Sequence, residues 1–179
     1  MVAQRNNIGG GVGRPAPKPH GTITLKHNNE PITILLVDDD ADCRMLVRDA
    51  ISACKVSNKV YEASGGAEAL DYLYRRGRFQ GVPRPGLVYL DIEMPGLDGQ
   101  ETLRQIRANP EFRAIPVVMM TGVSDEQQMK LAAANGANSY TIKPANAEQF
   151  LRTVLASTDY WLSIHQSPMH HLRPEDCRR

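Results

Sequence analysis

The sequence has no long hydrophobic run and no excess of charge of either sign. No stretch of about eighteen consecutive apolar residues occurs, so we expect no membrane-spanning helix. Residues 1–20 lack the apolar core of a secretory signal. The 21 Lys and Arg residues nearly balance the 20 Asp and Glu residues, and a net charge of +1 gives no whole-chain attraction for nucleic acid or a membrane surface. We therefore expect a cytoplasmic protein whose partners recognise local features.

Cysteine is also scarce. The three cysteines, Cys43, Cys54 and Cys177, are an odd number without metal-ligand spacing, and two of them lie in a helix-like stretch. We expect free thiols in a reducing compartment. His170 and His171 lie near Cys177, but adjacent histidines have no fixed common face, so we expect no metal site there.

The chain of 179 residues has the length of one ordinary domain with additional ends. Residues 1–30 are rich in Gly, Pro and Asn and contain few large apolar side chains, which is typical of a flexible tail. We expect the domain over residues 31–165 and a second tail over 166–179. No basic recognition helix accompanies the domain, so we expect no direct contact with DNA.

Short apolar segments alternate with segments of helical periodicity. The strand-like segments are 32–37, 59–64, 87–91, 115–122 and 139–144, and the helix-like segments are 41–55, 65–77, 102–110, 126–137 and 147–164. Strict alternation of buried strands and helices predicts a doubly wound α/β fold, with a parallel sheet covered by helices on both faces. Apolar residues lie at helical spacing in the first two helices. They are Met45, Leu46, Val47, Ala50, Ile51 and Cys54 in the first, and Ala67, Leu70, Leu73 and Tyr74, on one helical face, in the second.

Polar residues follow four of the predicted strands at the point where each strand ends. Asp38 and Asp39 end the first strand, and Asp91 ends the third. Thr121 ends the fourth strand and Lys143 ends the fifth. Because ligands of such sheets bind beyond the carboxyl ends of the strands, we expect these side chains to surround one pocket.

The residue types indicate phosphoryl chemistry. Three neighbouring carboxylates repel one another unless a hard divalent cation such as Mg²⁺ or Mn²⁺ binds between them, so we expect Asp38, Asp39 and Asp91 to be metal ligands. A carboxylate can also be the nucleophile of phosphoryl transfer, and the flexible loop after Asp91 favours this residue as the acceptor. Lys143 supplies positive charge and Thr121 a hydroxyl. A cis peptide bond between Lys143 and Pro144 would direct the lysine inward.

Each of these residues has a simpler interpretation when taken alone. Acidic residues after a strand often cap the next helix, and we assign Asp40 and Asp42 to the surface or to a cap. A threonine after a strand is often a turn residue, and a Lys-Pro pair is often part of a loop. One suitable group at the end of each strand is harder to explain by coincidence.

Together these segments resemble the receiver domain of two-component signalling, the family of the chemotaxis response regulators. The segments are ILLVDDD, LVYLDIEMPGLDG, VVMMTG and SYTIKP, and the likeness runs from about residue 32 to 162. It implies a flavodoxin-like, CheY-like strand order 2-1-3-4-5. It also implies Asp91 as phosphoacceptor of a histidine kinase, the backbone carbonyl of Glu93 as a further metal ligand, and Tyr140 as the switch aromatic that moves with Thr121.

The long segment before Leu87 and the closing YWLSIHQSP are similar to a narrower branch, the stand-alone regulators of phytochrome-type histidine kinases. The closing segment includes the aromatic pair Tyr160 and Trp161, although core packing at the end of a helix is an equally simple interpretation of Trp161. In that branch the last helix and its extension take part in homodimers, and the resemblance implies the same here. The resemblance implies a signalling protein that is not an enzyme but assists its own phosphorylation and dephosphorylation. Its output would pass to a protein bound over residues 126–164.

Two other functions are alternatives. Asp38, Asp40, Thr121 and Lys143 follow the chain order of a haloacid-dehalogenase-type phosphatase, but such enzymes need another acidic pair after the lysine, which is missing here. The second alternative is a receiver-shaped interaction module that is never phosphorylated.

Overall fold

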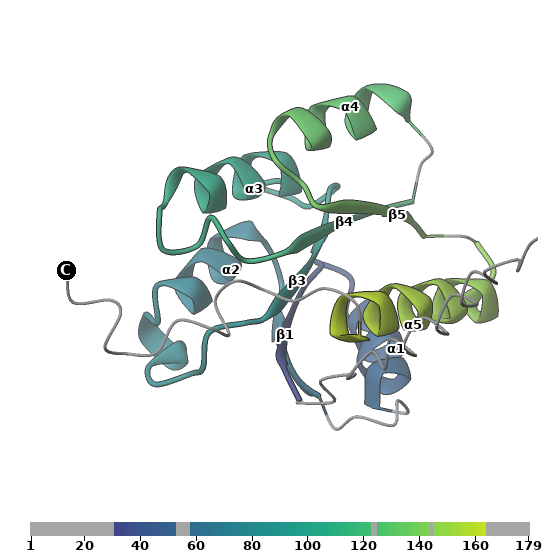
Figure 1. Ribbon diagram of the computed structural model, residues 1–179, viewed down its shortest axis with the longest axis horizontal. Coiled ribbons are helices and arrows are strands. Elements are labelled where there is room, and N and C mark those ends of the chain that lie inside the picture. Colours follow the sequence, from purple (N-terminus) through teal and green to yellow (C-terminus); the bar gives the residue numbers. More distant parts are fainter. Residues whose placement is uncertain (1–30, 53–57, 123–124, 144, 164–179) are drawn as a thin grey trace, which may run out of the picture.

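The computed structural model describes residues 31–52, 58–122, 125–143 and 145–163. Its five strands form one parallel sheet in the order β2-β1-β3-β4-β5 (Figure 1). The strands are β1 (Thr33–Val37), β2 (Lys59–Ala63), β3 (Leu87–Asp91), β4 (Val117–Thr121) and β5 (Ser139–Ile142). The predicted doubly wound fold and strand order are confirmed.

Helices cover both faces of the sheet. They are α1 (Ala41–Ser52), α2 (Gly66–Leu73), α3 (Gly99–Ala108), α4 (Glu126–Ala134) and α5 (Ala147–Ser163), and a short 3-10 turn, η1 (Gly77–Phe79), follows α2. Within the described residues no helix is both long and apolar enough to cross a bilayer. The described residues include neither of the two predicted tails. They also do not include Cys54, Pro144, His170, His171 or Cys177.

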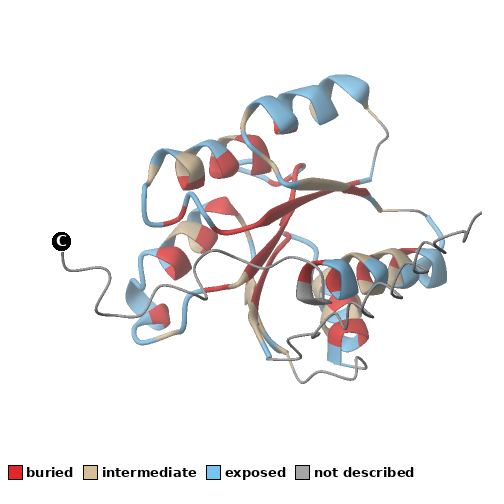
Figure 2. Ribbon diagram, viewed as in Figure 1, coloured by how far each residue is buried: buried red, intermediate tan, exposed pale blue. Residues whose placement is uncertain are grey.

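The strands are buried on both sides because their side chains alternate between two cores. In β1, Leu35 and Val37 join the core under α2 and α3, whereas Ile34 and Leu36 join the core under α1 and α5. The strands β3 and β4 are buried at every position, which explains their continuous apolar sequence (Figure 2).

Two of the predicted helix faces are partly wrong. Met45 of α1 is 49% exposed, although Val47 and Ile51 are fully buried as expected. Leu73 of α2 is buried as expected, but Ala67 is exposed and Tyr74, directly after the helix, is 43% exposed. Ala69 and Tyr72 are buried instead. Tyr74 packs edge-to-face against the ring of the buried Phe112, with ring centroids 4.9 Å apart.

The helix α3 begins three residues earlier than the sequence indicates. The Asp98 carboxylate accepts a hydrogen bond from the Glu101 amide at 2.8 Å and so caps the first turn. Gly99 brings this turn against the end of β3, because a Cβ atom on Gly99 would lie 2.0 Å from the Asp91 carbonyl oxygen. The glycine therefore permits the close approach of α3 to the strand that carries Asp91.

We predict that Gly99→Ala destabilises the protein by on the order of 1–3 kcal/mol, because the added methyl group meets backbone atoms that cannot move independently. Urea unfolding measures this change. Gly122→Ala is the matched control, since a Cβ atom on Gly122 has no neighbour within 4 Å. Its effect should stay within about 0.5 kcal/mol. Equal stability of the two variants would contradict the packing described for Gly99.

Candidate functional site

Three carboxylates meet at the carboxyl edge of the sheet. Asp38 and Asp39 follow β1, and Asp91 ends the neighbouring strand β3. Each of the three offers a carboxylate oxygen, and these oxygens all lie within 4.8 Å of one another. Asp38 and Asp91 are buried, whereas Asp39 is exposed, so the cluster opens to solvent on one side.

Lys143, which follows β5, reaches into this cluster. Its ammonium nitrogen lies 2.6 Å from Asp38 Oδ2 and 3.0 Å from Asp91 Oδ2. The lysine side chain is only 18% exposed, so both ion pairs are largely shielded from water. The sequence prediction that these residues gather in one place is therefore correct for Asp38, Asp39, Asp91 and Lys143.

The charges in the cluster are strongly coupled. Burial raises the pKa of Asp91 from 3.8 to about 6, although the Lys143 ammonium opposes the rise. Burial alone would lower the pKa of Lys143, but its hydrogen bond to Asp38 and the charge of Asp91 outweigh burial and raise it. The lysine therefore stays protonated and supplies a fixed positive charge beside the acids.

Thr121 and Tyr140 lie next to this cluster. Thr121 is buried at the end of β4, and its carbonyl oxygen accepts a hydrogen bond from the Lys143 amide at 2.6 Å. The β4 residue before it, Met120, is paired with Asp91. Burial raises the pKa of Tyr140, and the nearby Thr121 hydroxyl opposes this rise. The two residues proposed as a switch pair are thus neighbours.

The remaining acidic residues near the site have different surroundings. The Asp40 carboxylate accepts hydrogen bonds from the amides of Asp42 and Cys43 at 2.9 and 3.3 Å, which confirms the predicted helix cap. Asp42 and Glu93 are exposed. Glu93 lies in the loop after β3, two residues beyond Asp91.

Sequence reasoning missed two residues of the first helix. Arg44 donates a hydrogen bond to the Asp38 carbonyl oxygen at 2.6 Å and also pairs with Glu62 of β2. Cys43 is a free thiol, as expected, but burial and a hydrogen bond with Asp38 raise its pKa to about 12. The helix α1 begins directly after Asp40, so its first residues must lie close to Asp38. This short connection is the feature of the sequence that could have identified Cys43 and Arg44.

The pocket has the chemistry of a divalent-cation site. Mg²⁺ and Mn²⁺ prefer oxygen ligands, and Mg²⁺ commonly binds to one or two carboxylates while keeping other positions open. The three acids supply such oxygens, and the exposed side of Asp39 leaves access for water or a phosphate group. The donor set fits the cation that the sequence predicted.

We predict that Asp91 makes stability depend on pH in metal-free buffer. Its folded pKa of about 6 exceeds its ordinary value of 3.8, so the folded protein holds this proton more tightly than the unfolded chain does. The resulting stabilisation is complete below pH 4 and is lost as the pH rises through about 6, a change on the order of 3 kcal/mol. Asp91→Asn removes it.

Urea unfolding between pH 4 and pH 7 in the presence of a chelator tests this dependence. Relative to Asp91→Asn, the wild-type chain should lose stability as the pH rises. Asp42→Asn, a change at an exposed acid outside the cluster, should follow the wild-type profile. Identical pH profiles for the wild type and Asp91→Asn would contradict the raised pKa of the buried Asp91 carboxyl group.

Comparisons with known proteins agree with the geometry of the site. The model of the family described as the response regulator receiver domain matches residues 34–155. A probable methanogenesis regulatory protein, FilR2, of Methanothrix harundinacea is 37% identical over 78% of this chain and 89% of its own length. The response regulator Rcp1 of Synechocystis sp. is 30% identical over 79% of this chain and 96% of its own length.

Solved structures show the same fold. The phosphorylated cyanobacterial phytochrome response regulator RcpA has a TM-score of 0.74 and 30% identity, and the match covers 77% of this chain and 99% of RcpA. The Mn²⁺-bound form of Rcp1 has a TM-score of 0.72 and 29% identity over the same shares of the two chains. The chain belongs to the response regulator receiver domain family of two-component signalling proteins.

Proposed function

We propose that Asp91 accepts a phosphoryl group from a phosphohistidine of a sensor kinase. One carboxylate oxygen of Asp91 forms a bond to phosphorus while the phosphorus–nitrogen bond breaks, and the electron pair of that bond returns to the imidazole. The observation that carries this proposal is the Lys143 ammonium, which lies 3.0 Å from Asp91 Oδ2 and so stands where a transferred phosphoryl group brings negative charge.

Lys143 and Thr121 have separate roles in this proposal. Lys143 neutralises charge on the phosphoryl oxygens. Its ammonium nitrogen already lies within 3.0 Å of a carboxylate oxygen of both Asp38 and Asp91, so only a small movement would take it from Asp38 to a phosphoryl group on Asp91. Thr121 donates its hydroxyl to another phosphoryl oxygen. The hydrogen bond from the Lys143 amide to the Thr121 carbonyl keeps the ends of β4 and β5 together.

The proposed cation ligands are the carboxylates of Asp38, Asp39 and Asp91 and the backbone carbonyl of Glu93. When bound, Mg²⁺ or Mn²⁺ would neutralise the acids and polarise the phosphoryl oxygens. The clustering of the three carboxylate oxygens supports this assignment, as does the Mn²⁺-bound form of the relative Rcp1. The same residues would assist hydrolysis of the aspartyl phosphate.

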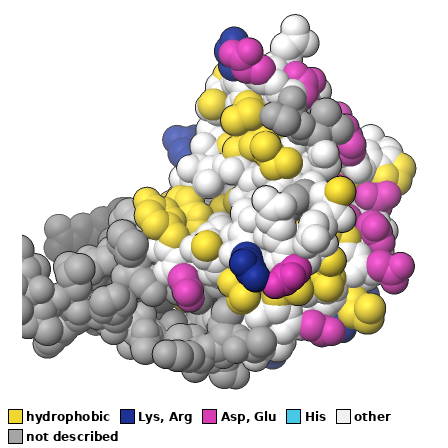
Figure 3. Space-filling model, turned by 90° about the vertical axis from the view of Figure 1, so that its right-hand side faces the viewer, with side chains coloured by type: hydrophobic (Ala, Val, Ile, Leu, Met, Phe, Trp, Pro, Cys, Tyr) yellow, Lys and Arg dark blue, Asp and Glu magenta, His cyan; other side chains and the backbone are white. Residues whose placement is uncertain are grey.

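The proposed output face consists of α4, β5 and α5. Movement of Thr121 toward the phosphoryl group would shift Tyr140, which lies on β5. This face carries exposed apolar side chains, namely Met129, Leu131, Ile142 and Tyr160. Figure 3, which views the molecule from the right-hand side of Figure 1, shows hydrophobic side chains gathered between charged ones. Such a surface suits a protein partner.

The proposed upstream partner is a histidine kinase of the phytochrome type, because the matched structures include phytochrome response regulators along nearly their whole length. A homodimer through α5 also belongs to this proposal. In α5 the exposed Tyr160 ring packs edge-on against the buried Trp161 ring at 5.3 Å between centroids. The cytoplasmic location and the lack of nucleic-acid binding stay predictions.

Incubation of the full chain with Mg²⁺ and a small acyl phosphate, followed by intact-mass measurement, tests the proposed acceptor. We expect one phosphate adduct in the wild type and none in Asp91→Asn. Asp98→Asn is the matched control, because this acid lies seven residues away and its role as a helix cap is preserved by asparagine. The control should form the adduct at the wild-type rate.

Two results would contradict the proposal. An adduct that persists in Asp91→Asn would move the acceptor to another residue. The absence of any adduct in the wild type, with either an acyl phosphate or a phosphorylated histidine kinase as donor, would favour the interaction module that is never phosphorylated.

A further inference from the structure

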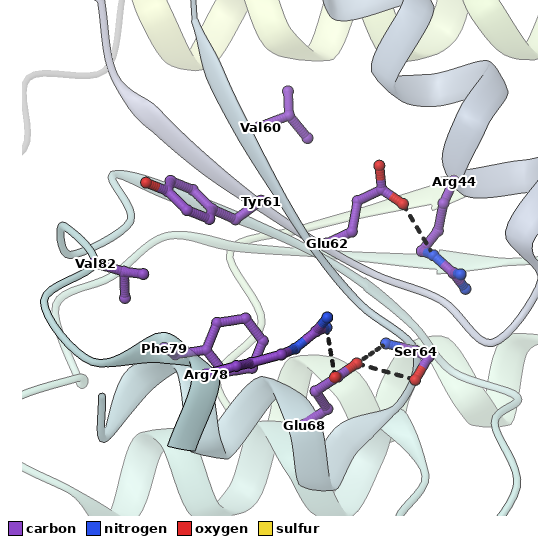
Figure 4. Close-up of a pocket in the computed structure, with 9 residues that line it drawn as sticks. All are labelled: Arg44, Val60, Tyr61, Glu62, Ser64, Glu68, Arg78, Phe79 and Val82. Atoms are coloured by element: carbon purple, nitrogen blue, oxygen red, sulfur yellow. Dashed lines mark hydrogen bonds and ion pairs between the residues drawn. The ribbon is translucent and has the colours of Figure 1, made fainter. Parts of the chain in front are cut away.

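A groove runs along the outer edge of the sheet, away from the acidic pocket. It has a volume of about 640 Å³ and is lined by residues of α1, β2, α2, η1 and the loop after η1. Figure 4 shows that the β2 backbone passes through its centre, with side chains from both faces of the sheet on either side. The proposed phosphoryl transfer uses none of these lining residues.

The floor of the groove is the unpaired edge of a strand. β2 is the terminal strand of the sheet and pairs with β1 alone among the described strands. The Lys59 amide donates to the Ile32 carbonyl, and the Ala63 carbonyl accepts from the Asp38 amide, so the odd-numbered residues direct their backbone groups to β1. Backbone direction alternates along a strand, and Val60 and Glu62 therefore direct theirs into the groove.

The two walls of the groove differ in character. On the α2 side lie the apolar side chains of Tyr61, Phe79 and Val82, and Phe79 is almost completely buried. The Arg78–Glu68 ion pair borders this apolar part, with the Arg78 guanidinium over the Phe79 ring (Figure 4). On the α1 side Arg44 pairs with Glu62 at 3.2 Å. An extended segment that fits both walls has apolar side chains on one face and polar side chains on the other. A second copy of the sheet edge would bring its own flanking helices against these walls.

We propose that this groove binds residues 22–26 of the same chain, with the sequence TITLK, as a sixth strand antiparallel to β2. Ile23 and Leu25 alternate with Thr22, Thr24 and Lys26, which is the pattern that the two walls require. Residues directly opposite in an antiparallel pair share one face of the sheet. Pairing the even residues with Val60 and Glu62 therefore places Ile23 and Leu25 on the face of Tyr61 and Phe79.

The connection is long enough for this arrangement. The Ile32 amide donates to the Asn58 side chain, so the described chain begins beside the start of β2. From β1 to a strand beyond β2 the distance is two strand spacings, roughly 10 Å. Residues 27–30 can span roughly 13 Å. A tether of this length gives the segment an effective concentration on the order of millimolar, which favours it over a free peptide.

Amide hydrogen exchange of the full-length chain, read residue by residue by NMR, tests the proposal. We expect slow exchange at Val60 and Glu62 in the wild type, and loss of that protection in the double variant Ile23→Asp with Leu25→Asp. A double variant of the opposite face, Thr22→Ser with Thr24→Ser, is the matched control and should keep the protection. The amides of Tyr61 and Ala63, which face β1, should stay protected in every variant and so report an intact sheet.

Two results would overturn the proposal. One is fast exchange at Val60 and Glu62 in the wild type, which would mean that the edge is open. The other is protection that survives in the Ile23→Asp and Leu25→Asp variant. If that surviving protection rises with protein concentration, the groove is instead occupied by a second copy of the chain.

Discussion

The described site depends on one buried interaction, the contact of the Lys143 ammonium with both Asp38 and Asp91. Two carboxylates that are almost completely buried cannot both be ionised without a nearby positive charge. Lys143 supplies that charge from the end of a strand two positions away from β3 in the sheet. The contact therefore joins segments more than a hundred residues apart and keeps the acidic pocket intact in the protein without metal.

The rest of the fold places these groups. A parallel sheet directs the carboxyl ends of all its strands to one edge, so acids after β1 and β3 and a lysine after β5 become neighbours without a dedicated loop. Gly99 lets α3 start against Asp91, and Arg44 ties the Asp38 backbone to Glu62 of β2. Through Arg44 the acidic pocket is connected to the groove at the outer edge of the sheet.

Much of this could be read from the sequence, because buried parallel strands are continuous apolar runs and their last residues are the polar groups of the site. Helix faces were harder to predict. The short α2 offers several apolar residues at helical spacing, and Tyr74 packs against the ring of Phe112, a residue far along the chain. The contacts of Cys43 and Arg44 with Asp38 depend on the angle at which α1 leaves the sheet, which no sequence pattern specifies.

The most direct test of the central contact is calorimetric titration of the full chain with Mg²⁺ near neutral pH, for the wild type and Lys143→Met. An ammonium between the two acids repels a divalent cation, so its removal should tighten Mg²⁺ binding by at least about tenfold. Lys130→Met, which removes an exposed lysine paired with Glu126 on α4, should leave the affinity unchanged. Unchanged or weaker Mg²⁺ binding in Lys143→Met would contradict the account.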